Sequence, residues 1–233
     1  MSQFDAETEW ERWRGWLGVE PKQPTIFQDV VTMMATRQIW DEYREVYDHA
    51  PDRARSHGTF DNWLAGNYWR TQVMAVRRQV DQRRDVVSLR RLLLQIKKHP
   101  EVLNVERVAR DRDADAAQAA RDLASLVRVD GDHIEAAEVE EDLFQLKKDT
   151  HSVRRLATKS VAHYDEKLHE IVLEPVTWGE LNAAIDTIVE LFTKFRQLVL
   201  GAYMTNVVQM VPWTGIFEVA WFDPSGDPDP FGP

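Results

Sequence analysis

The sequence predicts an all-α domain built as a helical bundle. Apolar side chains recur at spacings of three and four along most of the 233 residues, and this interval places them on one face of a helix. Prolines and glycines interrupt the pattern at 18–24, 51–58 and 175, which separates the predicted helices. A hydrophobic fraction of 43% and a charged fraction of 29% are typical of a globular protein, so we expect one domain over residues 1–222.

Two helices are predicted within residues 4–47. The first, over 4–17, carries Trp10, Trp13 and Trp16 on one face. Two interpretations of this tryptophan stripe stay open: it docks against the body of the domain, or it docks a partner protein. The second helix runs from about residue 25 to 47.

The middle of the chain alternates strong and weak helical patterns. A helix over about 59–84 is apolar on two faces, which predicts a central position, and Ser88 is suited to cap the next helix, 89–98. Residues 101–131 are charged and rich in alanine, and they predict a helical hairpin insert or a mobile excursion. One long helix is expected from about 133 to 172.

The C-terminal part contains a clear helix start. Thr177-Trp178-Gly179-Glu180 matches a capping box, and the last helix is expected to run to about residue 204. A short extended segment follows near 216–222, and the acidic, proline-rich residues 223–233 predict a flexible tail. The 21 residues at 197–217 carry no charge but include a proline and several amides, so we expect no membrane span.

Composition excludes several classes of function. Cysteine is absent, which removes disulfides, thiolate metal sites and cysteine nucleophiles and fits a cytoplasmic protein. No glycine-rich phosphate loop, paired-histidine zinc motif or Gly-x-Ser-x-Gly elbow occurs, and we expect neither a metal nor a cofactor. Seven of the nine tryptophans fall into groups that are close in sequence, and only Trp40 and Trp178 lie outside these groups. This distribution indicates packing or partner docking and gives no hint of a platform on which nucleic-acid bases would stack.

Charge is strongly segregated along the chain. The net charge of −10 argues against a general nucleic-acid coat. Residues 70–98, however, contain nine basic and two acidic side chains, a net charge of +7. Such a basic patch is suited to a short RNA, a nucleotide or an acidic partner.

Residues 153–165 carry the candidate chemistry. Arg155, Lys159 and His163 follow one another at intervals of four, so on a regular helix they share a sector of roughly 80°. Neighbouring cations lower the pKa of an imidazole and favour its neutral, basic form. Two cations that hold a phosphate beside a histidine that moves a proton would form a phosphodiester site. The alternative is an ordinary solvated helix face.

The same segment resembles the signature of the HEPN superfamily, in which four to six residues lie between an arginine and a following histidine. Val161-Ala162-His163 lies behind upstream basic residues, while Trp63-Leu64, Val76–Asp81 and Ser88–Leu93 resemble the abortive-infection, Abi-U-like branch. The resemblance covers about residues 60–204. It implies a bundle that forms a homodimer through the His163 helix face and acts in anti-phage defence as a metal-independent endoribonuclease.

The resemblance assigns His163 as general acid and base, with Arg155 and Lys159 contacting phosphate. The chain departs from the family pattern because Ala157 stands where an arginine is frequent, and lysine lacks the planar fork with which arginine grips phosphate. The alternative is therefore a non-catalytic HEPN module that binds RNA, a nucleotide or a partner protein from the same operon, within a defence or toxin–antitoxin complex.

Arg78 and Asp81 form a second constellation. They are three residues apart on the inward stripe of the predicted 59–84 helix, and a buried arginine requires a partner. Two interpretations stay open: an internal salt bridge that holds the bundle, or a pair of pocket residues near His163.

Overall fold

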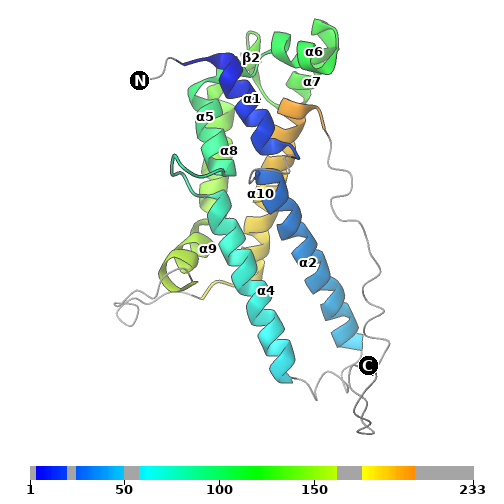
Figure 1. Ribbon diagram of the computed structural model, residues 1–233, viewed down its shortest axis with the longest axis vertical. Helices are drawn as coiled ribbons and strands as arrows, with labels where there is room; N and C mark the ends of the chain where they lie inside the picture. The colour runs from blue at the N-terminus through cyan, green and yellow to red at the C-terminus, as the bar shows by residue number, and fades with distance from the viewer. Residues whose placement is uncertain (1–3, 20–24, 50–57, 162–174, 203–233) are drawn as a thin grey trace, which may run out of the picture.

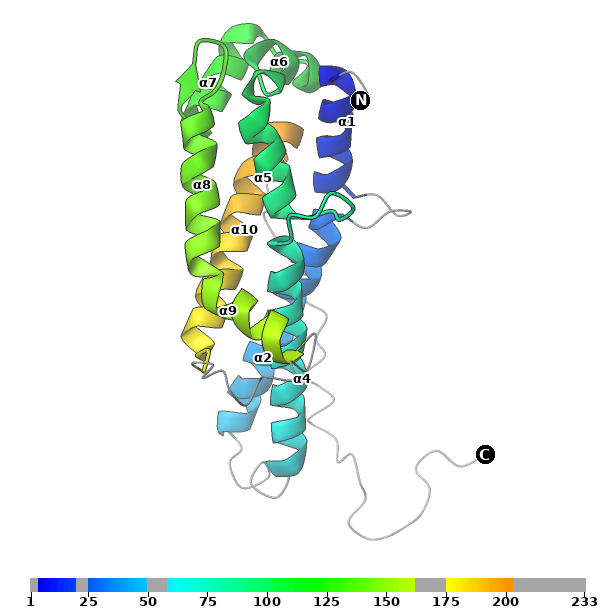
Figure 2. The same ribbon diagram turned by 90° about the vertical axis from the view of Figure 1, so that its left-hand side faces the viewer.

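Helices make up nearly all of the chain that the computed structural model describes, which is residues 4–19, 25–49, 58–161 and 175–202. The four columns of the bundle are α1 (Ala6–Leu17) above α2 (Ile26–His49), α5 (Leu89–Lys98) above α4 (Gly58–Gln79), α8 (Ala136–Asp149), and α10 (Trp178–Leu200) (Figures 1 and 2). The predicted all-α class is confirmed. The lower ends of α2 and α4 project beyond α10 in both views.

α10 is the central helix of the bundle. It packs against α1, α2, α4 and α8. Its buried residues repeat at helical spacing: Leu181, Ala184, Ile185, Thr187, Ile188, Leu191, Phe192, Phe195, Leu198 and Val199. The predicted capping box is confirmed, since the Thr177 hydroxyl accepts from the Glu180 amide while Glu180 accepts from the Thr177 amide.

α10 ends at Leu200, earlier than the predicted residue 204. Gly201 adopts a φ of 65°, the left-handed conformation that terminates helices. Arg112 then donates to the carbonyl oxygens of Gln197 (2.6 Å), which also accepts from the Gly201 amide (2.9 Å), and of Leu198 (3.0 Å). A side chain distant in sequence thus helps to fix where the helix stops.

The tryptophan stripe of α1 is part of the core. Trp10 and Trp13 are 0% exposed and Trp16 is 8% exposed. The indole nitrogen of Trp13 donates to Gln95 on α5 at 3.1 Å. Docking against the body of the domain is confirmed, and partner docking through Trp10, Trp13 and Trp16 is wrong because these side chains present no free face.

The charged insert forms a helical hairpin, which confirms one of the two alternatives predicted for it. It comprises a 3₁₀ turn (Pro100–Val102), α6 (Val105–Arg112) and α7 (Ala116–Leu126) at the upper end of the bundle (Figure 1). A two-stranded antiparallel hairpin, β1 (Val129–Asp130) and β2 (His133–Ile134), follows. The predicted helix start at residue 133 is therefore wrong, because the backbone there pairs as a strand.

The single helix predicted over 133–172 is interrupted. α8 ends at Asp149, and α9 (His151–Leu156) crosses toward α4 before continuing into a π-helical segment, Ala157–Val161 (Figure 2). The hydroxyl of Thr150 bonds back to the Leu146 carbonyl, and Asp149 accepts a hydrogen bond from Thr187 of α10 at 2.7 Å. Residues 162–174 lie outside the described part of the chain.

The third predicted helix also stops early, at Gln79 instead of about 84. The Gln79 side chain accepts from the Leu89 amide at 3.1 Å, and the Ser88 hydroxyl bonds to the Asp81 carbonyl, so the chain turns directly into α5. The predicted Ser88 cap is confirmed by its bond from the Arg91 amide at 3.2 Å.

No helix in the described ranges combines the length and apolarity that crossing a membrane requires. The predicted extended segment at 216–222 and the predicted tail at 223–233 both fall outside the described residues.

Candidate functional site

The predicted site residues occupy a short segment packed across α4. Arg154 and Arg155 lie in the last turn of α9, and Lys159 lies in the π-helical segment that follows. Val153 and Ala157, both 0% exposed, are buried in the core beneath this segment, which packs against α4. His163 lies outside the described residues, so the structure leaves its position relative to these cations open.

The beginning of α9 is tied to the beginning of α10. Hydrogen bonds from the backbone and side chain of Thr177 and from the Ser152 side chain lower the pKa of Glu180. The same carboxylate is the capping residue of α10, so one anion joins the two helix starts.

Ala157, the position at which the resemblance leads one to expect an arginine, opens the π-helical segment. Ala157, the first residue of the segment, is 0% exposed in the core. An arginine at this position would need to bury its charge, which is costly without a partner. Arg155 is exposed and Lys159 is partly buried. Single π-helical turns are rare in proteins and occur frequently at functional sites.

Arg90 and Arg154 are brought together by α5 and α9. Burial lowers the pKa of the Arg90 guanidinium and the charge of Arg154 lowers it further, while Asp81 acts in the opposite direction. Within the described chain neither arginine forms an ion pair with a carboxylate. We call Arg90, Arg154, Arg155 and Lys159 the basic cluster.

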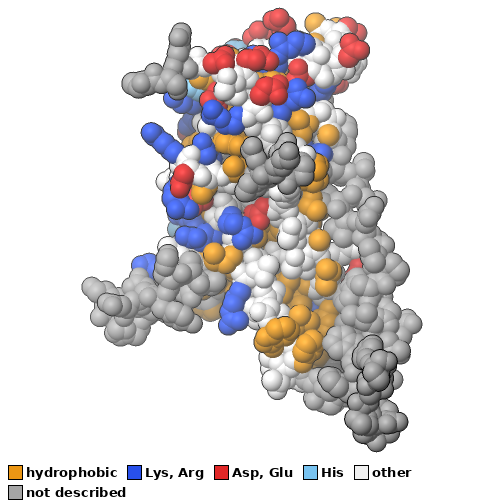
Figure 3. Space-filling view, in the orientation of Figure 1, with side chains coloured by type: hydrophobic (Ala, Val, Ile, Leu, Met, Phe, Trp, Pro, Cys, Tyr) orange, Lys and Arg blue, Asp and Glu red, His pale blue; other side chains and the backbone are white. Residues whose placement is uncertain are grey.

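Further cations surround the basic cluster. Lys and Arg side chains gather over α5, the loop that precedes it and α9, whereas the acidic side chains on the same face concentrate at the upper end (Figure 3). Arg91 is held in place, because it donates to the Val86 carbonyl at 2.6 Å and lies 4.7 Å from the Trp16 ring centre. The segregation of charge predicted from the sequence is therefore a feature of the surface.

The predicted Arg78–Asp81 pair is wrong. The Arg78 side chain is 51% exposed and binds Asp29 of α2, and Asp81 pairs with Arg83 at 3.1 Å. The cause is the early end of α4 at Gln79, which takes Asp81 off the helical stripe that the prediction assumed. Asp81 nevertheless borders the basic cluster, since it acts on Arg90.

An aromatic cluster joins α2, α4 and α10. Trp40 of α2 stacks against Trp178 of α10 with ring centres 5.7 Å apart, and against Tyr68 of α4 at 4.9 Å. This arrangement agrees with the packing that the sequence indicates for the tryptophans. The fold joins these two tryptophans across three helices, a juxtaposition that no local pattern encodes.

Among the described residues, no three histidine or carboxylate side chains lie together in a way that would hold a metal ion. No protein-family model matches the chain, and no curated protein or solved structure shows significant similarity to it. The basic cluster presents positive charge, which favours the approach of an anion.

Proposed function

We propose that this protein is a HEPN-type, metal-independent endoribonuclease of a bacterial anti-phage or abortive-infection system, with the basic cluster as its phosphate-binding site. The observation that carries the proposal is the proximity of two arginines, Arg90 and Arg154, neither of which forms an ion pair in the described chain, although the charge of Asp81 also acts on Arg90. Two cations held together repel each other, and an anion bound between them relieves the repulsion. The segment that supplies Arg154 leads within a few residues to His163.

In the proposed reaction, the basic cluster holds the scissile phosphate of an RNA strand. The ribose 2′-hydroxyl attacks the adjacent phosphorus, His163 moves the proton, and the 5′-oxygen of the next nucleotide leaves. Arg154 and Arg90 stabilise the negative charge that develops on the phosphoryl oxygens. Arginine is suited to this role because its planar fork makes two bonds to one phosphate.

A homodimer belongs to the same proposal. Arg155 is exposed on the segment that the resemblance places at the dimer interface, so a second copy would add its own cations to one RNA groove. An RNA of the host or the phage as substrate places the activity in the cytoplasm, where a partner encoded in the same operon would control it.

One observation favours a second candidate, a non-catalytic module that binds RNA, a nucleotide or a partner protein. Ala157 is buried at the position where the family motif carries an arginine, and so the full catalytic pair is not present at the usual spacing. Such a module would keep the affinity of the basic cluster for phosphate and lack cleavage.

The test measures growth on induction and cleavage of labelled single-stranded RNA in the presence of EDTA. Wild type should arrest growth and cut RNA, and His163→Ala and Arg154→Ala should do neither. Arg121→Ala, which removes an exposed arginine of α7, is the matched control and should behave as wild type. RNA binding without cleavage in wild type would favour the second candidate, and absence of both binding and cleavage would overturn the proposal.

A further inference from the structure

A pocket of about 430 Å³ opens where α2, α4 and the first turns of α10 meet, and none of its lining residues belongs to the basic cluster. The rings of Trp40, Tyr68 and Trp178 line it, together with Ala65 and the polar side chains of Asp41, Arg44 and Asn182. This volume falls within the range typical of sites for small ligands.

The ring walls of the pocket are held firmly. The rings of Trp40, Tyr68 and Trp178 lie within 9° to 21° of parallel, with centres 4.9 to 5.8 Å apart. Trp69 meets Trp178 edge-on, with centres 4.7 Å apart and an angle of 80°. Tyr68 is only 5% exposed, whereas Trp178 remains 44% exposed, so a large aromatic surface is presented without a mobile wall.

The pocket lining carries one carboxylate, Asp41, and one guanidinium, Arg44. Burial raises the pKa of Tyr68 to about 12 and the charge of Asp41 adds to this effect, which places the carboxylate near the phenol. Within the described chain, Asp41 accepts no hydrogen bond and forms no ion pair. Burial raises the pKa of Asp41, and the charge of Arg37, which pairs with Asp186 at 2.5 Å, acts in the opposite direction.

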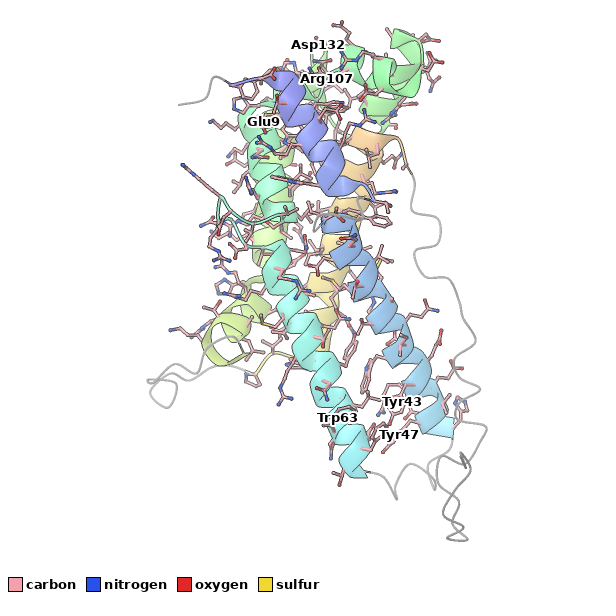
Figure 4. All side chains as sticks on the ribbon, viewed as in Figure 1. Glu9, Tyr43, Tyr47, Trp63, Arg107 and Asp132 are labelled. Carbon is pink, nitrogen blue, oxygen red and sulfur yellow. The ribbon has the colours of Figure 1, made fainter. Side chains whose placement is uncertain are left out.

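Arg44 already makes cation–π contacts with aromatic rings in this region. Arg44 lies 4.9 Å from the ring centre of Tyr47 and 6.0 Å from that of Trp40. Tyr47 projects from the lower part of α2, on the side that faces α4 (Figure 4). Arg44 is paired with Asp48 at 3.1 Å and lies 3.8 Å from Asp61, so its charge is offset and does not repel a second cation.

We propose that this pocket binds an organic cation of the alkylated ammonium class. Ring faces attract cations through their quadrupole, and an unpaired carboxylate at the rim supplies the opposite charge. The ligand is either a small quaternary ammonium compound or a methylated lysine side chain of a protein, since both present the same group.

The test titrates the full-length protein with choline and follows tryptophan fluorescence and calorimetric heat. The neutral isostere 3,3-dimethylbutan-1-ol has the same shape without the charge. Choline should bind at least about tenfold more tightly than the isostere, given the strength of desolvated cation–π contacts. The second arm of the test compares two peptides of one sequence, one with trimethyl-lysine and one with unmodified lysine. Tighter binding of the methylated peptide would show that the natural ligand is a methylated lysine of a protein.

Two variants separate the contributions of ring and charge. Trp178→Ala should weaken choline binding about tenfold, and Asp41→Asn, at an exposed position, should weaken it about threefold. Trp63→Ala and Glu190→Gln are the matched controls outside the pocket and should bind as wild type. Equal binding of the isostere, or full binding by a folded Trp178→Ala protein, would overturn the proposal. RNA cleavage should be unchanged in both pocket variants, so the two proposals fail independently.

Discussion

Arg78 on α4 donates two hydrogen bonds to one carboxylate oxygen of Asp29 on α2, from its Nε at 3.1 Å and from its Nη2 at 2.5 Å. Gln79 donates to the second oxygen at 2.6 Å, and its own side-chain oxygen accepts from the Leu89 amide. A single carboxylate therefore joins α2 to α4 and, through Gln79, to the start of α5. Since α5 carries Arg90, the same network supports one side of the basic cluster.

Replacing Asp29 by alanine should destabilise the protein. The Asp29 side chain is only 19% exposed and has two partners, so its loss should lower the free energy of unfolding by about 2 kcal/mol, or Tm by roughly 4–8 °C. Asp81→Asn is the control, because its partner Arg83 is 64% exposed and such pairs contribute about 1 kcal/mol or less. Equal melting temperatures for the two variants would contradict the conclusion that Asp29 stabilises the protein by connecting α2 to α4.

The core position of the α1 tryptophans makes a sharper stability prediction. Trp13→Ala should lower the free energy of unfolding by about 3–5 kcal/mol, because it empties a fully buried site and leaves Gln95 without its partner. Trp63→Ala removes a side chain that is 61% exposed and should change the free energy of unfolding by less than about 0.5 kcal/mol. Denaturation in urea measures both, and a mild effect at Trp13 would restore the interpretation of the stripe as a docking surface for a partner.

Elements whose ends are encoded locally could be predicted from the sequence. α5 begins at Leu89, directly after its Ser88 cap, and α10 begins directly after Thr177, since a capping side chain and its amide partner are only three residues apart. The break at Thr150 could not be predicted, because apolar spacing continues through it. The contact of Asp149 with Thr187 at this junction joins helices that are distant along the chain.

The same distinction separates the parts of the candidate site. Arg155 and Lys159 could be found because they are neighbours in the sequence. Arg90 could not be chosen among the nine basic residues of 70–98, since only the crossing of α9 places Arg154 beside it. The pairing of Trp40 with Trp178 could not be predicted for the same reason, as their stacking exists only once α2 and α10 are packed together.

The capping box of α10 should make stability depend on pH through Glu180. Hydrogen bonds hold the pKa of Glu180 below its ordinary value of 4.5, so its stabilising effect is complete above that value and is lost as pH falls through the folded-state pKa. Glu180→Gln should therefore lower Tm at pH 7, and the difference from wild type should shrink as pH falls below the ordinary pKa of the carboxyl. Glu190→Gln removes an exposed charge from the same helix and should show no such dependence.

The basic cluster predicts a variant that loses RNA affinity without losing stability. Arg154→Ala should weaken binding of a single-stranded RNA at every sequence and reduce the slope of log affinity against log salt by about 0.7 for each phosphate that the variant no longer neutralises. Its Tm should be equal to that of wild type or higher, because the repulsion of Arg90 disappears. Arg121→Ala, in an exposed position on α7, should alter neither quantity. Filter binding across salt concentrations and thermal melting give the two readouts. A lower Tm with an unchanged salt slope would show that Arg154 serves the fold and would remove it from the phosphate site.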